Sequence, residues 1–262
     1  MIALGCALLL SGCSSSATPA SSSNPTVASS SNPTVASSTP REVWSVVALG
    51  DSVPRGTNCG CTPYPQLTAS YLTASDRRGV KATNDAVGGF TSTDVVRQLR
   101  SDSDVISDVA NADVVEIEIG ANDVAYSGSC GTTVSCYQPM ISSTERNLDQ
   151  IAARIHQLTE GRPTQLILLD YWSVWLGGRY ADAEGPVYVD AVASVTDQVN
   201  TVIKRTAADT DSGYVDLRAI FKGQDYDSDE TPYLASDGDH PNAAGHQKIA
   251  AAVTDVVSQS LH

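Results

Sequence analysis

Beyond residue 42, short apolar runs alternate with segments of helical periodicity, and this alternation constrains the fold more than any other feature of the chain. The apolar runs with strand character lie at residues 44–49, 81–87, 113–119, 165–170 and 214–217. Stretches such as VVAL and LILL are typical of strands covered on both faces of a parallel sheet. Helical periodicity is clearest at 141–159, from Pro186 to Ile203 and at about 243–260. We therefore expect an α/β fold with three α/β/α layers, in which a flavodoxin-like, parallel, five-stranded sheet carries helices on both faces.

The charge balance of the chain is acidic. The sequence has 30 Asp and Glu residues against 16 Lys and Arg residues, and its formal net charge is -14. Nucleic-acid binding requires a clustered positive surface, so we expect no nucleic-acid partner. The same charge predicts weak attraction to anionic lipids, so any membrane contact has to come from another source. We expect a monomer.

The N-terminal segment offers such a source. Residues 2–10 form an apolar run too short to span a bilayer, and Leu10-Ser11-Gly12-Cys13 overlaps its end. This tetrapeptide resembles the bacterial lipobox, in which a signal is cut before a cysteine that then carries lipid. We expect a signal peptide at 1–12 and lipidation of Cys13, which would anchor the protein to the outer face of a bacterial cell membrane. No Lys or Arg precedes the run, and an ordinary secretory signal stays the alternative.

A segment of low complexity separates this signal from the alternating region. Residues 14–40 are rich in Ser, Thr, Ala and Pro, and SSNPTVAS occurs twice, at 22–29 and 30–37. Such a composition cannot bury a core. We therefore expect a disordered tether at 13–41 and a single folded domain at 42–262.

Four cysteines lie beyond the N-terminal segment: Cys59, Cys61, Cys130 and Cys136. An even number in an exported chain predicts two disulfides. Cys130 and Cys136 close an easy local loop, which leaves Cys59 and Cys61 as a C-G-C pair of demanding geometry. Pairing between the two loops therefore stays open. A zinc site is disfavoured, because C-x-C is an unusual spacing and no histidine is close in sequence.

Motifs whose residues could take part in catalysis follow the first three predicted strands, where sheets of this kind bind ligands. Gly-Asp-Ser at 50–52 follows the first strand, so that the Ser52 hydroxyl can project into a crevice and helix N–H groups can favour an oxyanion. Gly-Gly at 88–89 follows the second strand and permits close backbone approach. Asn122 follows the third, and its amide can donate to an oxyanion. Taken singly, each motif is most often a turn or a helix cap.

A further motif, Asp-Gly-Asp-His-Pro-Asn at 237–242, stands directly before the last predicted helix. Histidine is the usual general base, because it titrates near neutral pH. Asp237 lies three residues before His240 and can hold one ring nitrogen while the other faces a nucleophile. Asp239 competes for this role, but its near-adjacency makes the geometry worse. The other histidines (His156, His246 and His262) are expected on the surface.

In this order the motifs resemble those of the SGNH (GDSL) hydrolase family, over about residues 44–258. The residues that match the family name are Ser52, Gly89, Asn122 and His240, with Gly89 aligning slightly better than Gly88. The resemblance implies a serine esterase in which Ser52 attacks an acyl carbonyl, His240 accepts its proton and Asp237 orients His240. The N-terminal segment adds the expectation that this esterase is secreted or lipid-anchored. It also implies an oxyanion hole made by the N–H groups of Ser52 and Gly89 and the side chain of Asn122. No cofactor or metal is implied.

The substrate is expected to be an acyl ester of a small molecule, a glycan or a lipid. Phe90 stands where the family often has Asp, and Val53 where it often has Leu, so Phe90 can alter the rim of the site. Phe90, Trp172 and Trp175 are candidate substrate-binding residues, since aromatic rings stack on sugars or line acyl pockets. The two tryptophans can equally pack a loop onto the sheet. Carbohydrate esterase, lipase and thioesterase activities therefore stay open.

Other functions fit the motifs less well. An α/β-hydrolase needs a G-x-S-x-G elbow, which the chain lacks, and a metal-dependent phosphoesterase needs more histidines near the first strand. The acidic stretch at 225–229 resembles the start of an EF-hand, but Glu230 and Ser236 stand where Gly and Glu are required. We expect a solvated loop there. From a different class, a non-catalytic surface-binding lipoprotein on an esterase scaffold is the alternative.

Overall fold

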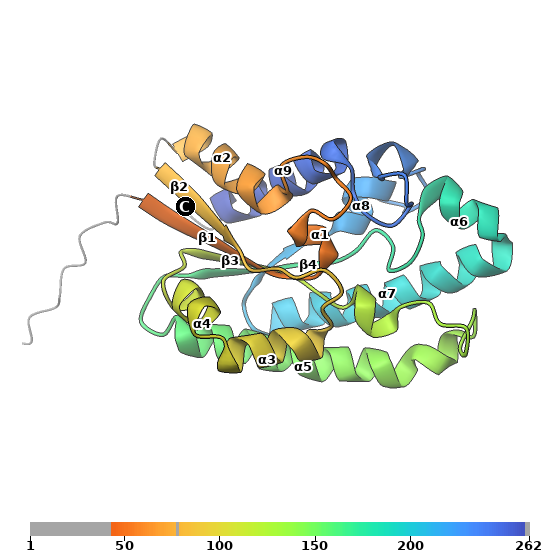
Figure 1. The fold of residues 1–262 in the computed structure, drawn as a ribbon, viewed down its shortest axis with the longest axis horizontal. Helices are drawn as coiled ribbons and strands as arrows, with labels where there is room; N and C mark the ends of the chain where they lie inside the picture. The colour runs from red at the N-terminus through yellow and green to blue at the C-terminus, as the bar shows by residue number, and fades with distance from the viewer. Residues whose placement is uncertain (1–42, 77–78, 260–262) are drawn as a thin grey trace, which may run out of the picture. The chain divides into compact units, whose positions relative to one another are not determined.

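The computed structural model describes residues 43–76 and 79–259, and its centre is a parallel sheet in the order β2-β1-β3-β4-β5 (Figure 1). The strands are β1 (Val43–Gly50), β2 (Gly79–Asn84), β3 (Val114–Glu118), β4 (Gln165–Leu169) and β5 (Gly213–Val215). All pairs of neighbouring strands are parallel. The predicted fold class, strand number and strand direction are confirmed. The signal peptide, the lipidated Cys13, the tether and His262 lie outside the described residues.

Helices cover both faces of this sheet (Figure 1). One layer contains α2 (Tyr64–Asp76), α8 (Leu217–Lys222) and α9 (Ala243–Gln259). The other contains α3 (Ser92–Ser101), α4 (Ser103–Ala110), α5 (Gln138–Leu158) and α7 (Pro186–Asp209). Two short helices, α1 (Ser52–Arg55) and α6 (Gly178–Glu184), belong to loops beyond the carboxyl ends of strands. No helix in the described part of the chain combines the length and apolarity that crossing a membrane requires.

The end of β1 shows why the chain requires a glycine there. Gly50 has a φ of +146°, and a Cβ at this position would lie 2.0 Å from the carbonyl oxygen of Glu118 on β3. The two strands therefore approach too closely for any side chain. Beyond the strands, the N–H of Asp51 donates to Glu118 O (3.2 Å) and the N–H of Val87 donates to Gly50 O (3.0 Å). These bonds hold the loops after β1 and β2 at the same edge of the sheet.

The structure corrects several local predictions. β2 ends at Asn84 rather than at 87, because the Asn84 side chain accepts from the N–H of Ala86 and turns the chain. Leu217 begins α8 rather than ending a strand, because Asp216 caps that helix through the N–H of Ala219. His246 is fully buried, whereas the sequence predicted a surface position. It faces α2, a helix that the sequence analysis did not predict, and the N–H of Tyr64 donates to its Nδ1 (3.2 Å).

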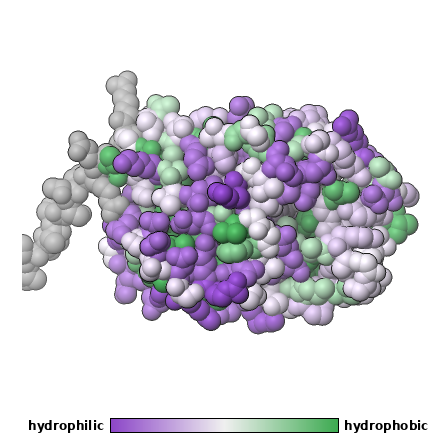
Figure 2. Space-filling model, in the orientation of Figure 1, coloured by the Kyte–Doolittle hydropathy of each residue, from purple (hydrophilic) through white to green (hydrophobic). Residues whose placement is uncertain are grey.

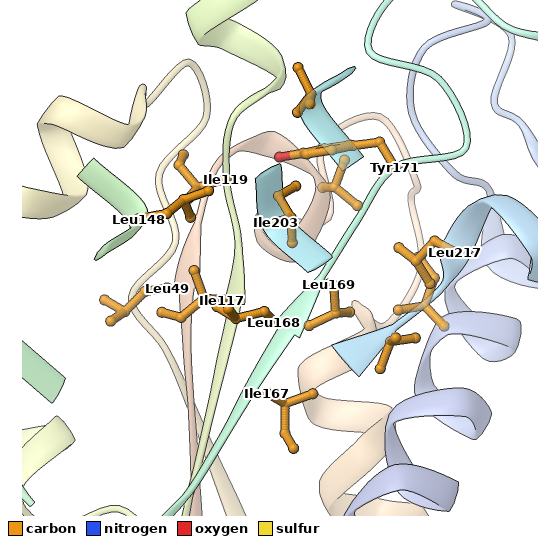
Figure 3. Close-up of a cluster of buried hydrophobic side chains, with 14 of the residues drawn as sticks. Leu49, Ile117, Ile119, Leu148, Ile167, Leu168, Leu169, Tyr171, Ile203 and Leu217 are labelled. Carbon is orange, nitrogen blue, oxygen red and sulfur yellow. The ribbon is translucent and has the colours of Figure 1, made fainter. Parts of the chain in front are cut away.

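The two faces of β3 differ in chemistry. Ile117 of β3, and Ile119 directly after the strand, face the apolar layer that includes Leu148 of α5 and Ile203 of α7 (Figure 3). Glu116 lies on the opposite face and is fully buried. Burial raises its pKa to about 8, because the charged carboxylate is disfavoured in a low-dielectric interior. The core thus contains carboxyl groups, those of Glu116 and Glu118, on one face of β3. The molecular face drawn in Figure 2 is mainly hydrophilic with scattered apolar groups.

This buried carboxyl predicts that stability falls as pH rises. Unfolded Glu116 loses its proton near pH 4.5 and folded Glu116 near pH 8, so its stabilising contribution is complete below pH 4.5 and is lost up to pH 8. The loss amounts to about 1.4 kcal/mol per pH unit between these limits. Glu116→Gln should remove this part of the slope, as measured by urea unfolding between pH 5 and 8. A variant with the wild-type slope would contradict the assignment.

Candidate active site

Ser52 is the first residue of α1, directly beyond the carboxyl end of β1. Asp51 caps this helix: its Oδ1 accepts from the N–H of Val53 (2.9 Å), and its Oδ2 accepts from the Tyr171 hydroxyl (2.6 Å). Burial raises the pKa of Asp51 to about 6, although these two hydrogen bonds act in the opposite direction. Asp51 therefore serves to fix the turn that presents Ser52.

His240 sits on the loop before α9, together with its acidic partner. The His240 Nδ1 lies 2.8 Å from Asp237 Oδ2, and the backbone N–H of His240 donates to Asp237 Oδ1 (3.1 Å). Asp239 Oδ2 is farther from Nδ1, at 3.9 Å. A carboxylate at this distance favours the tautomer in which Nδ1 carries the proton and Nε2 is the basic nitrogen. Of the two candidate acids, Asp237 is the one placed to orient the imidazole.

The carboxylate of Asp237 is held in its charged form. Burial raises its pKa, but hydrogen bonds from the side chains of Asn58 and His240 and from the N–H groups of His240 and Asp239 outweigh this effect. The net result is a pKa of about 2. Asp237 is therefore ionised whenever His240 acts near neutral pH.

Ser52 and His240 line the same cavity, whose volume is about 430 Å³. The His240 Nε2 is buried and hydrogen-bonds to no group among residues 43–76 and 79–259. No hydrogen bond joins this nitrogen to the Ser52 hydroxyl in the described structure, and such bonds are often long before substrate is bound. The Ser52 hydroxyl and the unengaged Nε2 of His240 therefore border one cavity.

Asn122 lies on the 3-10 helix η1 (Ala121–Val124) after β3 and lines the same cavity. Its Nδ2 donates to the carbonyl of Phe90 (2.9 Å), which ties it to the loop that carries Gly88 and Gly89. That loop passes beside the nucleophile, since a Cβ at Gly88 would lie 3.9 Å from the Cβ of Ser52. Asp123 strengthens the connection through its hydrogen bonds to Ser92.

Two predicted site residues lie outside this cavity. Gly89 has a φ of +83° and does not line the cavity, although its loop borders Ser52. Phe90 faces a separate surface depression that it shares with Val87 and Arg97. Trp172 and Trp175, by contrast, are both in the cavity wall.

Part of the cavity wall is aromatic. Trp175 Nε1 donates to the carbonyl of Val124 (2.7 Å), which satisfies its polar group and leaves its ring for packing. The rings of Tyr126 and Tyr188 lie 5.1 Å and 5.5 Å from the Trp175 ring. The sequence analysis missed these two tyrosines because they stand at no strand end. Both line the cavity beside Trp175, which only the three-dimensional structure shows.

The described cysteines form two local disulfides, Cys59–Cys61 and Cys130–Cys136. Within the described residues, Cys59, Cys61 and His246 make the one group of soft ligands whose atoms lie within 4.8 Å of one another. The disulfide removes the two thiolates that would bind a metal ion. The oxidised pair therefore does not fit a metal centre.

A family model described as GDSL-like Lipase/Acylhydrolase family matches residues 48–248. The solved lipase Lip_vut3 from a goat rumen metagenome is 18% identical with a TM-score of 0.62, over 81% of this chain and 97% of that one. The acetylxylan esterase Axe2 from Geobacillus stearothermophilus is 22% identical with a TM-score of 0.58, over 82% and 94%. TesA is 18% identical with a TM-score of 0.57, over 83% and 99%.

At these identities the solved structures show a shared fold. The match to the family model, over residues 48–248, shows the relationship in sequence. No match was found among curated protein sequences.

The two acids beside His240 provide a matched test. Asp237→Asn should lower kcat for an aryl ester by about 10³–10⁴-fold, because the amide favours the wrong tautomer of His240. Asp239→Asn should change kcat by less than about tenfold, since its carboxylate lies 3.9 Å from Nδ1. Steady-state kinetics of both variants measure the difference. Equal losses, or a larger loss for Asp239→Asn, would contradict the assignment of Asp237.

Proposed function

The chain belongs to the GDSL-like lipase/acylhydrolase family, and on that premise we propose that it is a serine esterase that hydrolyses acyl esters. One observation carries the proposal. Ser52 and the unengaged Nε2 of His240 border one cavity, and the opposite ring nitrogen of His240 lies 2.8 Å from the Asp237 carboxylate. This arrangement supplies a nucleophile, a general base and the group that orients the base.

In the proposed reaction, the Ser52 hydroxyl attacks the acyl carbonyl while His240 Nε2 takes its proton. The resulting tetrahedral oxyanion collapses, the acyl–oxygen bond of the ester breaks, and His240 returns the proton to the departing alcohol. Water then attacks the acyl-serine with the same assistance from His240, which releases the carboxylic acid and restores Ser52. Asp237, ionised throughout, stabilises the imidazolium that forms in both steps.

The developing oxyanion requires donors beside Ser52. We assign this role to the N–H groups of Ser52 and Gly89 and to the Asn122 side chain. Asn122 lines the cavity, and its bond to the Phe90 carbonyl fixes its amide next to the glycine loop. Preorganised donors of this kind stabilise the transition state more than the ground state.

Removal of these groups has separable effects. Ser52→Ala should abolish ester hydrolysis above background, because no acyl-enzyme can form. Asn122→Ala should lower kcat by about 10²–10³-fold in a protein that still unfolds cooperatively, because it removes one oxyanion donor. Ester kinetics and thermal unfolding of the two proteins provide the test. An Asn122→Ala protein with wild-type kcat on its best substrate would show that Asn122 does not stabilise the oxyanion.

The cavity suits two classes of substrate. Aromatic walls suit either an acyl chain or a sugar ring, and the names of structurally similar proteins include both a lipase and an acetylxylan esterase. A series of p-nitrophenyl esters from acetate to palmitate, run beside acetylated xylan, separates the two. A steep preference for acetyl groups on the glycan supports a carbohydrate esterase, whereas kcat/KM that rises with chain length supports a lipase or thioesterase. Wild-type protein that cleaves none of them would favour the non-catalytic binding function.

The Leu-Ser-Gly-Cys sequence at 10–13 supports the further proposal that this esterase is exported and held at a membrane by lipid on Cys13. Palmitate labelling of cells that express the full chain tests it. Label that persists in Cys13→Ser would rule out this anchor.

A further inference from the structure

We propose that Asn58 is a positioning residue for the His240–Asp237 pair, and that the Cys59–Cys61 disulfide holds Asn58 against Asp237. The inference rests on the proposed esterase function, because it concerns the same His240. It assigns a catalytic purpose to a loop that contains none of the four family motifs.

The contact itself joins residues that are 179 positions apart in sequence: Asn58 Nδ2 donates to Asp237 Oδ2 at 2.5 Å. This is the same oxygen that lies 2.8 Å from His240 Nδ1. The other oxygen, Oδ1, accepts the backbone N–H groups of Asp239 and His240, both at 3.1 Å. Asn58 is therefore the one side chain besides His240 that hydrogen-bonds to the carboxylate within the described chain.

The carboxylate needs such a partner because it is not enclosed. The Asp237 side chain is 28% exposed, whereas that of His240 is 12% exposed. Without Asn58, His240 Nδ1 would be the one group left to hold Oδ2 in place among the hydrogen bonds of the described chain. A hydrogen bond between an amide and a carboxylate is charge-assisted and directional, so it restricts rotation of the carboxylate.

The loop that carries Asn58 starts at the nucleophile. The N–H of Thr57 donates to the carbonyl of Ser52 (3.0 Å), and Gly56 ends α1 in a left-handed conformation with a φ of +80°. Asn58 is itself left-handed, with a φ of 57°. Asparagine tolerates this conformation better than most residues. The backbone therefore turns twice within three residues to bring the amide of Asn58 to Asp237.

The disulfide closes the loop immediately after Asn58. Cys59 and Cys61 are joined across a single residue, with their Cα atoms 5.1 Å apart. A ring this small leaves the backbone next to Asn58 little freedom. The far end of the loop is tied to the helix after His240, through the bond from the N–H of Tyr64 to His246 Nδ1. The 56–64 loop thus connects the serine side of the site to the histidine side.

Two substitutions at position 58 test the side-chain amide while the left-handed backbone conformation is kept. Asn58→Gly keeps the left-handed conformation and deletes the donor. It should lower kcat about tenfold with KM changed less than twofold, because one hydrogen bond to a charged group is lost. Rates are normalised to active sites titrated by a fluorophosphonate, so that misfolded protein does not count.

Asn58→Asp keeps the size and the backbone tolerance but turns the donor into a second carboxylate. At pH 8 the repulsion from Asp237 should lower kcat about a hundredfold. The pKa of the introduced carboxyl is raised by its neighbour, so at pH 5 it becomes a proton donor to Asp237. The ratio of variant to wild-type kcat should therefore recover about tenfold between pH 8 and 5. The other charged or titratable groups around Asp237 are His240 and Asp239, and both are common to the two proteins.

The disulfide is tested by coupling, with the second disulfide as the control. Cys59→Ser/Cys61→Ser should lower kcat about tenfold, and adding Asn58→Gly should cause no further loss, because both changes release the same contact. Cys130→Ser/Cys136→Ser removes a disulfide that closes no loop next to Asn58. Its effect on kcat should simply multiply with that of Asn58→Gly.

Each result bears on one proposal. Wild-type kcat in Asn58→Gly, or a pH-independent ratio in Asn58→Asp, would overturn the positioning role. Multiplicative effects of Cys59→Ser/Cys61→Ser and Asn58→Gly would overturn the role of the disulfide. If the wild-type protein hydrolyses no ester and its Ser52 does not react with the fluorophosphonate, the proposed function itself fails.

Discussion

The parallel pairing of β1 between β2 and β3 is the constraint on which the site depends. Because all strands run in one direction, the chain leaves β1, β2 and β3 at the same edge of the sheet. At Gly50 the neighbouring strand is so close that a Cβ has no space, and backbone bonds continue past the strand ends on both sides. Ser52, the Gly88-Gly89 loop and Asn122 meet because of this register.

Much of the fold was accessible from local sequence, and the exceptions share a cause. The apolar runs VVAL and LILL predict buried strands, and the prediction holds because both faces of β1 and β4 are covered. β3 alternates Glu with Val and Ile, and its carboxyl groups are buried none the less. His246 was assigned to the surface because its partner helix, α2, has weak apolar periodicity and was not predicted. Burial of a polar side chain depends on which elements pack together, and a local pattern does not contain that information.

The candidate site shows the same division. Ser52, Asn122 and His240 stand in short motifs with recognisable chemistry, and the structure brings them to one cavity. Gly89 and Phe90 belong to the same motifs but do not line it, and Phe90 faces a separate depression. Tyr126, Tyr188 and Asn58 have no motif at all. Their roles arise from contacts between loops that are distant in sequence, such as the bond from Asn58 to Asp237.

The central claim is that Ser52 is a nucleophile activated by His240. Reaction of the full-length protein with a fluorophosphonate, followed by peptide mass spectrometry, tests it most directly. We expect one phosphonyl group per chain, on the peptide that contains Ser52, and labelling at least a hundredfold slower in His240→Ala. Stoichiometric labelling at any other residue, or equal labelling rates in the two proteins, would contradict it.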